Sequence, residues 1–162
     1  SFMRLNDAAP AGAYFAGWDA SAAAQADRTA IVGLHHPAGD MLKISKGEVM
    51  GQTSCTITGE NQFGCVGTTG NFYMVTWNSG STQGGSSGSA MFSNDGRHVV
   101  GTLYGGSASC TNTGALDFYG RFDVSYSQAL KNWLGGQSGS GSGPGIAPID
   151  NILRVLRTLG GG

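Results

Sequence analysis

The sequence of 162 residues has few charged side chains and no long apolar run. Charged residues make up 12% of the chain, against roughly 25% in an average soluble domain, and the net charge is −1. A chain with so little excess charge lacks the basic surface that binds nucleic acids or anionic membranes. No apolar run approaches the roughly 20 residues that span a bilayer. We therefore expect neither a nucleic-acid partner nor a membrane partner.

Cysteine is also scarce, and its spacing does not match the common zinc motifs. The three cysteines, Cys55, Cys65 and Cys110, include no C-x-x-C pair and no Cys/His cluster. Cys55 and Cys65 bracket a short hairpin or loop, and their spacing suits a local disulfide. Cys110 is then left over, which suggests a bonding partner elsewhere or a free thiol. The alternative is a cytosolic protein with three reduced, buried thiols.

Glycine is abundant, with 29 residues, and short apolar runs alternate with polar turn residues. Runs such as TAIVGLHH, GEVM, FYMVTW and HVVGTLYG have the length and the β-branched and aromatic content of strands. Asp95 and Gly96, between SAMF and HVVGTLYGG, predict a tight hairpin. SYSQALKNWLGG predicts a helix that starts at Ser125 or Ser127 and buries one stripe: Ala129, Leu130, Trp133 and Leu134. Residues 1–134 are expected to form one β-rich domain that ends in this helix.

The two ends of the chain differ from the part between them. Residues 135–147 are rich in Gly and Ser, which is typical of a flexible linker. Residues 148–162 carry Ile and Leu at helical spacing, and we interpret them as a short amphipathic tail that starts another module or docks elsewhere. The chain begins without Met, in SFMRLN, which resembles a strand already under way. We expect upstream sequence to be missing.

A second run rich in Gly and Ser, STQGGSSGSAMF at 81–92, has a different context from the linker. It continues into AMF and the predicted hairpin, so we expect it to be held inside a folded sheet. Glycines held in this way expose backbone N–H groups. A serine hydroxyl beside them can serve as a nucleophile next to an oxyanion site.

The segment GGSSGSAMF resembles the nucleophile loop of trypsin-like serine proteases, and most resembles the bacterial lysyl endopeptidases. Other segments resemble that family in the same order: SFMRLN, YFAGWDA, LHHP, VVGTLYGGSASC and DFYGRF. The resemblance covers most of residues 1–134. It implies an all-β domain, the C-terminal antiparallel β-barrel of the chymotrypsin-like double-barrel fold, with a short C-terminal helix.

The resemblance also implies roles for single residues in the serine-rich loop. Ser87 would be the nucleophile, with Ser86 and Ser89 as its nearest competitors. The backbone N–H groups of Gly85 and Ser87 would form the oxyanion hole. His35 lies in LHHP but would not be the general base, because the catalytic His and Asp of the family precede the segment that SFMRLN resembles. His36 is excluded for the same reason.

The same resemblance implies how a substrate would be bound. Tyr104, Gly105 and Gly106 would present backbone to an extended peptide, with Tyr104 where lysyl endopeptidases carry a histidine. Asp117 would lie at the base of the specificity pocket and pair with a basic side chain. Ser81 occupies the place of the trypsin pocket aspartate and is not acidic, which favours the lysyl-specific arrangement.

The function implied is that of a serine endopeptidase fragment that cleaves after Lys, with Arg as the second candidate, through an acyl-enzyme. The implied partners are a peptide or protein substrate with a basic P1 residue and the missing N-terminal barrel of the same protease. A cysteine of that upstream region would pair with Cys110. Neither metal nor cofactor is implied. We expect a secreted, extracellular bacterial protein, and this chain alone is expected to be inactive.

Two other hypotheses remain open. The first is a catalytically silent trypsin-like homologue used for binding, because the triad His and Asp are absent from the chain. The second is a secreted carbohydrate-binding β-sandwich. That protein would present an exposed aromatic row made of Trp18, Trp77 and Tyr104.

Overall fold

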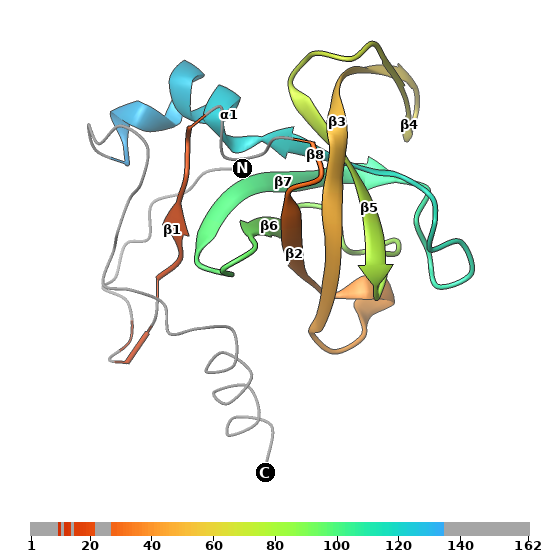
Figure 1. Ribbon diagram of the computed structural model, residues 1–162, viewed down its shortest axis with the longest axis horizontal. Helices are drawn as coiled ribbons and strands as arrows, with labels where there is room; N and C mark the ends of the chain where they lie inside the picture. The colour runs from red at the N-terminus through yellow and green to blue at the C-terminus, as the bar shows by residue number, and fades with distance from the viewer. Residues whose placement is uncertain (1–9, 11, 14, 22–26, 135–162) are drawn as a thin grey trace.

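The computed structural model describes residues 10, 12–13, 15–21 and 27–134. Its main feature is a closed, six-stranded antiparallel barrel (Figure 1). The barrel strands are β2 (Ala30–His35), β3 (Lys43–Gly59), β5 (Phe72–Ser79), β6 (Ala90–Ser93), β7 (His98–Gly106) and β8 (Asp117–Arg121). They pair in the order β7–β6–β2–β3–β5–β8, and the pairing of β8 with β7 closes the ring. The predicted all-β barrel is confirmed.

Shorter elements lie around the barrel. Strand β1 (Gly17–Trp18) pairs in parallel with β7, and β4 (Gln62–Val66) pairs antiparallel with β3. One turn of 3-10 helix, η1 (Pro37–Gly39), follows β2; α1 (Phe122–Gln128) and η2 (Leu130–Asn132) follow β8. In the part of the chain that the structure describes, no helix is long and apolar enough to cross a membrane.

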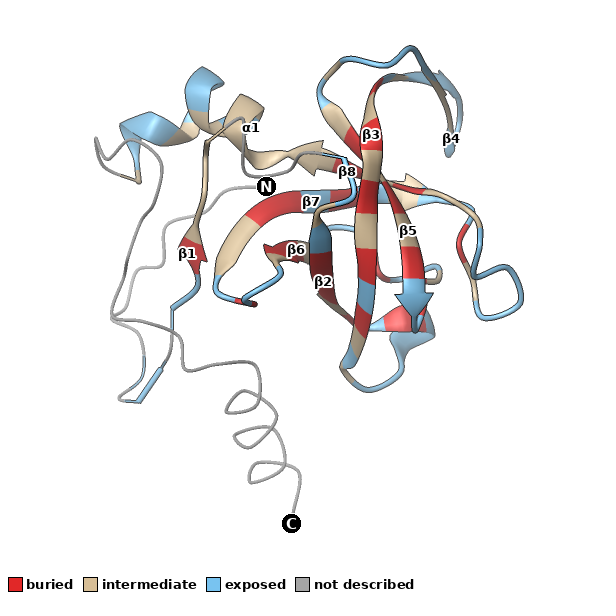
Figure 2. Ribbon diagram, in the orientation of Figure 1, coloured by how far each residue is buried: buried red, intermediate tan, exposed pale blue. Residues whose placement is uncertain are grey.

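Side-chain alternation in β3 explains how the barrel is filled. Every second residue from Ser45 to Thr53 is buried, as the banded colouring of this strand shows (Figure 2). This period of two is that of a strand with one face on a core. The buried cluster inside the barrel consists of Ile31, Val49, Tyr73, Val75, Trp77, Met91, Val100, Leu103, Ala108 and Tyr119.

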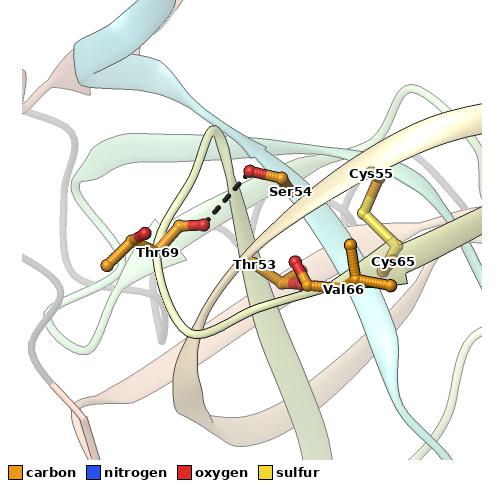
Figure 3. Close-up of a disulfide and its surroundings, with 6 residues drawn as sticks. All are labelled: Thr53, Ser54, Cys55, Cys65, Val66 and Thr69. Carbon is orange, nitrogen blue, oxygen red and sulfur yellow. Dashed lines mark hydrogen bonds between the residues drawn. A yellow bond between two sulfur atoms is a disulfide. The ribbon is translucent and has the colours of Figure 1, made fainter.

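Beyond Thr53, strand β3 leaves the barrel. It pairs with β5 as far as Thr53 and with β4 from Ser54 onward, forming a hairpin outside the ring. Cys55 and Cys65 are register partners in this hairpin and form a disulfide (Figure 3). The pairing predicted from the spacing of the two cysteines is confirmed. Cys110 is a free, exposed cysteine.

The predicted hairpin at Asp95 and Gly96 is present between β6 and β7. The Gly96 N–H donates to the Ser93 carbonyl at 2.7 Å, and Gly96 has a φ of 66°. Glycine adopts this left-handed conformation without steric cost.

The predicted C-terminal helix is present, but its start and its buried stripe were wrong. It begins at Phe122, where the Arg121 guanidinium and the Asp123 carboxylate form an ion pair across the first turn. It ends at Ala129, whose φ of −144° is not helical, before a separate 3-10 turn. Because the helical period stops there, the four stripe residues do not share a buried face: Ala129 and Trp133 are exposed, and Leu130 and Leu134 are half-buried.

The β-sandwich hypothesis is contradicted by the closed barrel. Trp77 lies in the core at 5% exposure and cannot join Trp18 and Tyr104 in an exposed aromatic row. The predicted linker and tail, residues 135–147 and 148–162, lie outside the described residues.

Candidate functional site

The loop between β5 and β6 carries three serines in different environments. Ser86 is 1% exposed, and its hydroxyl contacts the His35 ring. The Ser89 hydroxyl is also buried. Ser87 is exposed and lines a cavity. Of these three hydroxyls, that of Ser87 has the access that a nucleophile requires.

Backbone amides of this loop fall into two groups. The N–H groups of Ser86, Gly88 and Ser89 donate to the carbonyls of Gln83, Leu103 and Ser86 at 3.0, 2.8 and 3.1 Å. The N–H groups of Gly85 and Ser87 have no hydrogen-bond acceptor among the described residues. Both residues are exposed, so their N–H groups are available to a ligand.

Gly85 has a conformation that other residues rarely adopt. Its φ is 95°, and a Cβ built there would lie 3.2 Å from the Ala38 nitrogen and 3.3 Å from the His36 oxygen. Nearby, the Ala38 N–H donates to the Gly84 carbonyl at 2.7 Å. The loop is therefore packed closely against the segment that follows β2, and its glycine permits this approach.

The cavity beside Ser87 has a volume of about 500 Å³. One wall consists of Ser87 and the end of β7, so that Ser87 lies at the same cavity as Tyr104, Gly105 and Gly106. The rest of the lining comes from the β3–β4 hairpin, which no sequence motif connected with the site. Its lining residues are Ile57, Gly59, Asn61, Gln62 and Phe63.

Aromatic contacts hold the hairpin against β7. The Phe63 ring packs edge-on against Tyr104, with ring centroids 4.9 Å apart, and against Phe118 at 5.6 Å. A Cβ at Gly105 would lie 2.9 Å from the Phe63 ring, so glycine is required for this packing. Phe72 approaches Tyr104 from the other side at 5.2 Å. Tyr104 therefore belongs to an aromatic cluster and remains 40% exposed.

Asp117 lies beneath this wall and does not itself line the cavity. It is 1% exposed, and its Oδ2 atom accepts hydrogen bonds from Trp77 Nε1 at 2.7 Å and from Thr82 Oγ1 at 2.5 Å. Oδ1 faces the Cα of Gly106 so closely that a Cβ there would overlap it. The carboxylate is thus fixed in the barrel interior, with a glycine between it and the cavity. Burial and the nearby Asp117 charge raise the pKa of Tyr119.

None of the three histidines has a hydrogen bond to Ser87 in the described structure. His35 is buried, with its two ring nitrogens 3.0 Å from Ser86 Oγ and 2.9 Å from Ser45 Oγ. His36 contacts the Asp40 carbonyl, and His98 contacts the Asp95 carboxylate. Burial lowers the pKa of His35, although the Asp117 charge acts in the opposite direction. The sequence singled out LHHP but gave no local sign that His35 meets Ser86, 51 residues away.

Comparisons with known proteins identify a family model and a curated relative that match most of this chain. A family model described as lysyl endopeptidase, C-terminal domain, matches residues 1–120. The chain is 32% identical over 133 residues to a lysyl endopeptidase of Pseudomonas aeruginosa, covering 78% of this chain and 26% of that relative. The chain therefore spans about a quarter of the length of this curated relative.

Among solved structures, the chain is similar to the Rv3671c protease from M. tuberculosis. The active form shares 16% identity over 73% of this chain and 48% of that chain, with a TM-score of 0.47. The inactive form shares 14% identity over 68% of this chain and 51% of that chain, with a TM-score of 0.45.

Proposed function

Because the chain belongs to the lysyl endopeptidase family, whose C-terminal domain it matches, we propose that it supplies the nucleophile and specificity pocket of a serine endopeptidase. The family relationship supports a protease. The serine mechanism is supported chiefly by the loop after β5. There, the exposed residue Ser87 lines a cavity, and the N–H groups of Gly85 and Ser87 have no acceptor among the described residues.

In the proposed reaction, Ser87 Oγ attacks the scissile carbonyl carbon while a histidine base accepts its proton. The carbonyl oxygen becomes an oxyanion, which the N–H groups of Gly85 and Ser87 stabilise. Loss of one such donor typically costs about 3 to 4 kcal/mol of transition-state stabilisation. The protonated histidine donates its proton to the leaving amine, and water then hydrolyses the acyl-enzyme on Ser87.

Asp117 supports a preference for a basic P1 residue, with Lys as the first candidate and Arg as the second. A buried carboxylate next to the cavity wall favours a cationic side chain, because a buried charge needs an opposite charge. Trp77 and Thr82 both donate to one carboxylate oxygen, which orients the other toward Gly106. Tyr104, Gly105 and Gly106 would bind the peptide backbone by strand addition.

The base and its orienting acid would come from an upstream barrel. The three histidines of this chain have other contacts, so residues 1–162 alone should hydrolyse peptides negligibly. The Cys55–Cys65 disulfide and the family relationship support an extracellular bacterial protease.

Covalent labelling of the full-length protease with a fluorophosphonate tests the proposal. We expect a single adduct on Ser87 and its loss in Ser87→Ala. Ser89→Ala is the matched control, because its buried hydroxyl is not predicted to react, and it should keep the label. Labelling that persists in Ser87→Ala would refute the assigned nucleophile. A folded full-length protein that never takes the label would instead favour the catalytically silent homologue.

A further inference from the structure

His35 is buried at the end of β2 and contacts both the loop that follows β5 and strand β3. Its Nδ1 atom lies 3.0 Å from Ser86 Oγ in the nucleophile loop, and its Nε2 atom lies 2.9 Å from Ser45 Oγ on β3. We propose that His35 is a positioning residue, which acts through Ser86 to fix the loop that carries Ser87. This inference rests on the proposed function for its effect on catalysis, but the anchoring itself can be measured separately.

The neighbours of the ring suit a neutral imidazole. A neutral ring has one donor and one acceptor nitrogen, and each serine hydroxyl can take the complementary role. Burial and the adjacent His36 lower the pKa of His35, while Asp117 on β8 opposes them. Lys43, the register partner of His35 on β3, pairs with Asp40 at 3.1 Å. The loop residues 80–89 contain no titratable side chain.

Ser86 also organises the loop from within. Its N–H donates to the Gln83 carbonyl at 3.0 Å, while its hydroxyl accepts the Gln83 N–H at 3.3 Å. The Ser86 carbonyl accepts the Ser89 N–H at 3.1 Å. Because the same hydroxyl contacts His35, the imidazole ties the middle of the turn formed by residues 83–89 to the barrel, in addition to the hydrogen bonds between Gly88, Ser89 and Leu103 on β7.

A second contact holds the loop to the same segment of chain. The Ala38 N–H donates to the Gly84 carbonyl at 2.7 Å, and a Cβ at Gly85 would lie only 3.2 Å from the Ala38 nitrogen and 3.3 Å from the His36 oxygen. The segment of residues 35–39 therefore contacts Gly84, Gly85 and Ser86, the three residues that precede Ser87.

Loss of the anchor should affect turnover more than substrate affinity. Ser86 is joined by single peptide units to Gly85 and Ser87, whose N–H groups are the proposed oxyanion donors. The substrate-binding residues Tyr104 to Gly106 lie on β7 and do not contact the His35 network. A displacement of about 1 Å in a reacting group can reduce the rate about 100-fold.

Two substitutions at His35 separate its two hydrogen bonds. In His35→Asn the side-chain amide takes the place of Nδ1 and can reach Ser86; in His35→Gln it takes the place of Nε2 and can reach Ser45. In the full-length protease we expect His35→Gln to lower kcat about 10- to 100-fold with KM within about 2-fold. His35→Asn should keep kcat within about 3-fold.

Substitutions at the two serines form an independent pair. Ser86→Ala should lower kcat as His35→Gln does, whereas Ser45→Ala should lower thermal stability and leave kcat within about 2-fold. Both remove one hydroxyl and are far less disruptive than a change of the ring, so they test the proposal even if a His35 variant does not fold. The proposal would be overturned if the two His35 variants lost kcat equally and the two serine variants also lost it equally. His35 would then have a purely structural role.

Hydrogen–deuterium exchange of the full-length protein measures the anchor without catalysis. We expect faster exchange of peptides covering residues 83–89 in His35→Gln and Ser86→Ala than in His35→Asn and Ser45→Ala. If Ser87 were not the nucleophile, this difference would persist in a protein without activity. If exchange in that segment is the same in all four variants, the anchor is refuted whether or not the protein is a protease.

Discussion

Gly106 and Asp117 are register partners between β7 and β8, and the Oδ1 atom of the carboxylate occupies the space that a Cβ at residue 106 would need. A Cβ built at Gly106 would overlap Oδ1 and lie 2.6 Å from the Asp117 Cα and the Leu116 oxygen. Since two of these three atoms belong to the backbone, a side-chain rotation cannot relieve the overlap. The Asp117 carboxylate can therefore keep this position only if residue 106 is a glycine.

Gly106→Ala should consequently destabilise the barrel and impair cleavage after Lys. Overpacking of this kind costs about 1 to 3 kcal/mol of unfolding free energy. Urea unfolding and kcat/KM for a lysyl peptide measure the two effects. Gly114→Ala is the control, because nothing lies within 4 Å of a Cβ there. Equal stability of the two variants would contradict the tight contact.

Asp117→Asn keeps the shape of the side chain and an acceptor oxygen for Trp77 and Thr82, but removes the charge. We expect kcat/KM for a lysyl substrate to fall by about 100-fold or more, since removing one partner of a buried ion pair costs about 3 to 5 kcal/mol. A norleucine substrate, which has the same four-carbon side chain without the ammonium group, should be affected much less. Asp95→Asn, in an exposed turn, should change neither rate. An unchanged preference for Lys would exclude Asp117 as the specificity residue.

Replacing the disulfide by Cys55→Ser with Cys65→Ser should lower the free energy of unfolding by about 2 kcal/mol. This is the low end of the usual range, because the bridged segment is short. The stability can be measured by denaturant unfolding, with Thr56→Ser on the same exposed strand as a control. An identical unfolding midpoint in the double variant would show that the hairpin pairing suffices without the bridge.

Stability should depend on pH through His35. Its folded-state pKa is lowered from 6.5 by burial, so the unfolded chain binds a proton more readily than the folded one. The stabilising contribution is therefore complete above pH 6.5 and is lost as the pH falls below that value. Thermal unfolding between pH 8 and pH 5 should show a steeper loss for the wild type than for His35→Asn. Parallel curves would mean that His35 does not titrate differently on folding.

The sequence predicted individual strands because their signals are local, whereas the barrel was implied by the family resemblance. Runs such as FYMVTW and HVVGTLYG became β5 and β7, and the Asp95 and Gly96 turn joined the strands expected. By contrast, GEVM indicated only the middle of β3, which runs for 17 residues. The glycines and polar residues around it belong to the strand because they pair with β4 and β5, and such long-range pairing has no local signature.

The candidate site combines residues that a sequence motif singles out with contacts that no motif contains. The motif located Ser87 and Gly106 along the chain, and the structure brings both to one cavity. Two features could not be foreseen: the contact of Phe63 with Tyr104, and that of His35 with Ser86. Each joins residues distant in the sequence, and the second depends on Ser86 pointing inward while its neighbour points outward. Ser86 is buried and Ser87 is exposed, although the two residues are adjacent in the chain.

The β3–β4 hairpin stands outside the closed ring, because β4 pairs with β3 alone and β3 has no other strand partner from Ser54 onward among the described residues. Its turn could therefore gain or lose residues without shifting the register of any barrel pair. In the proposed protease, such changes would alter the side chains that line the cavity beside Ser87 while Asp117 and the loop of residues 81–89 stay in place. Related chains could thus diversify their preference for neighbouring substrate residues by hairpin length alone.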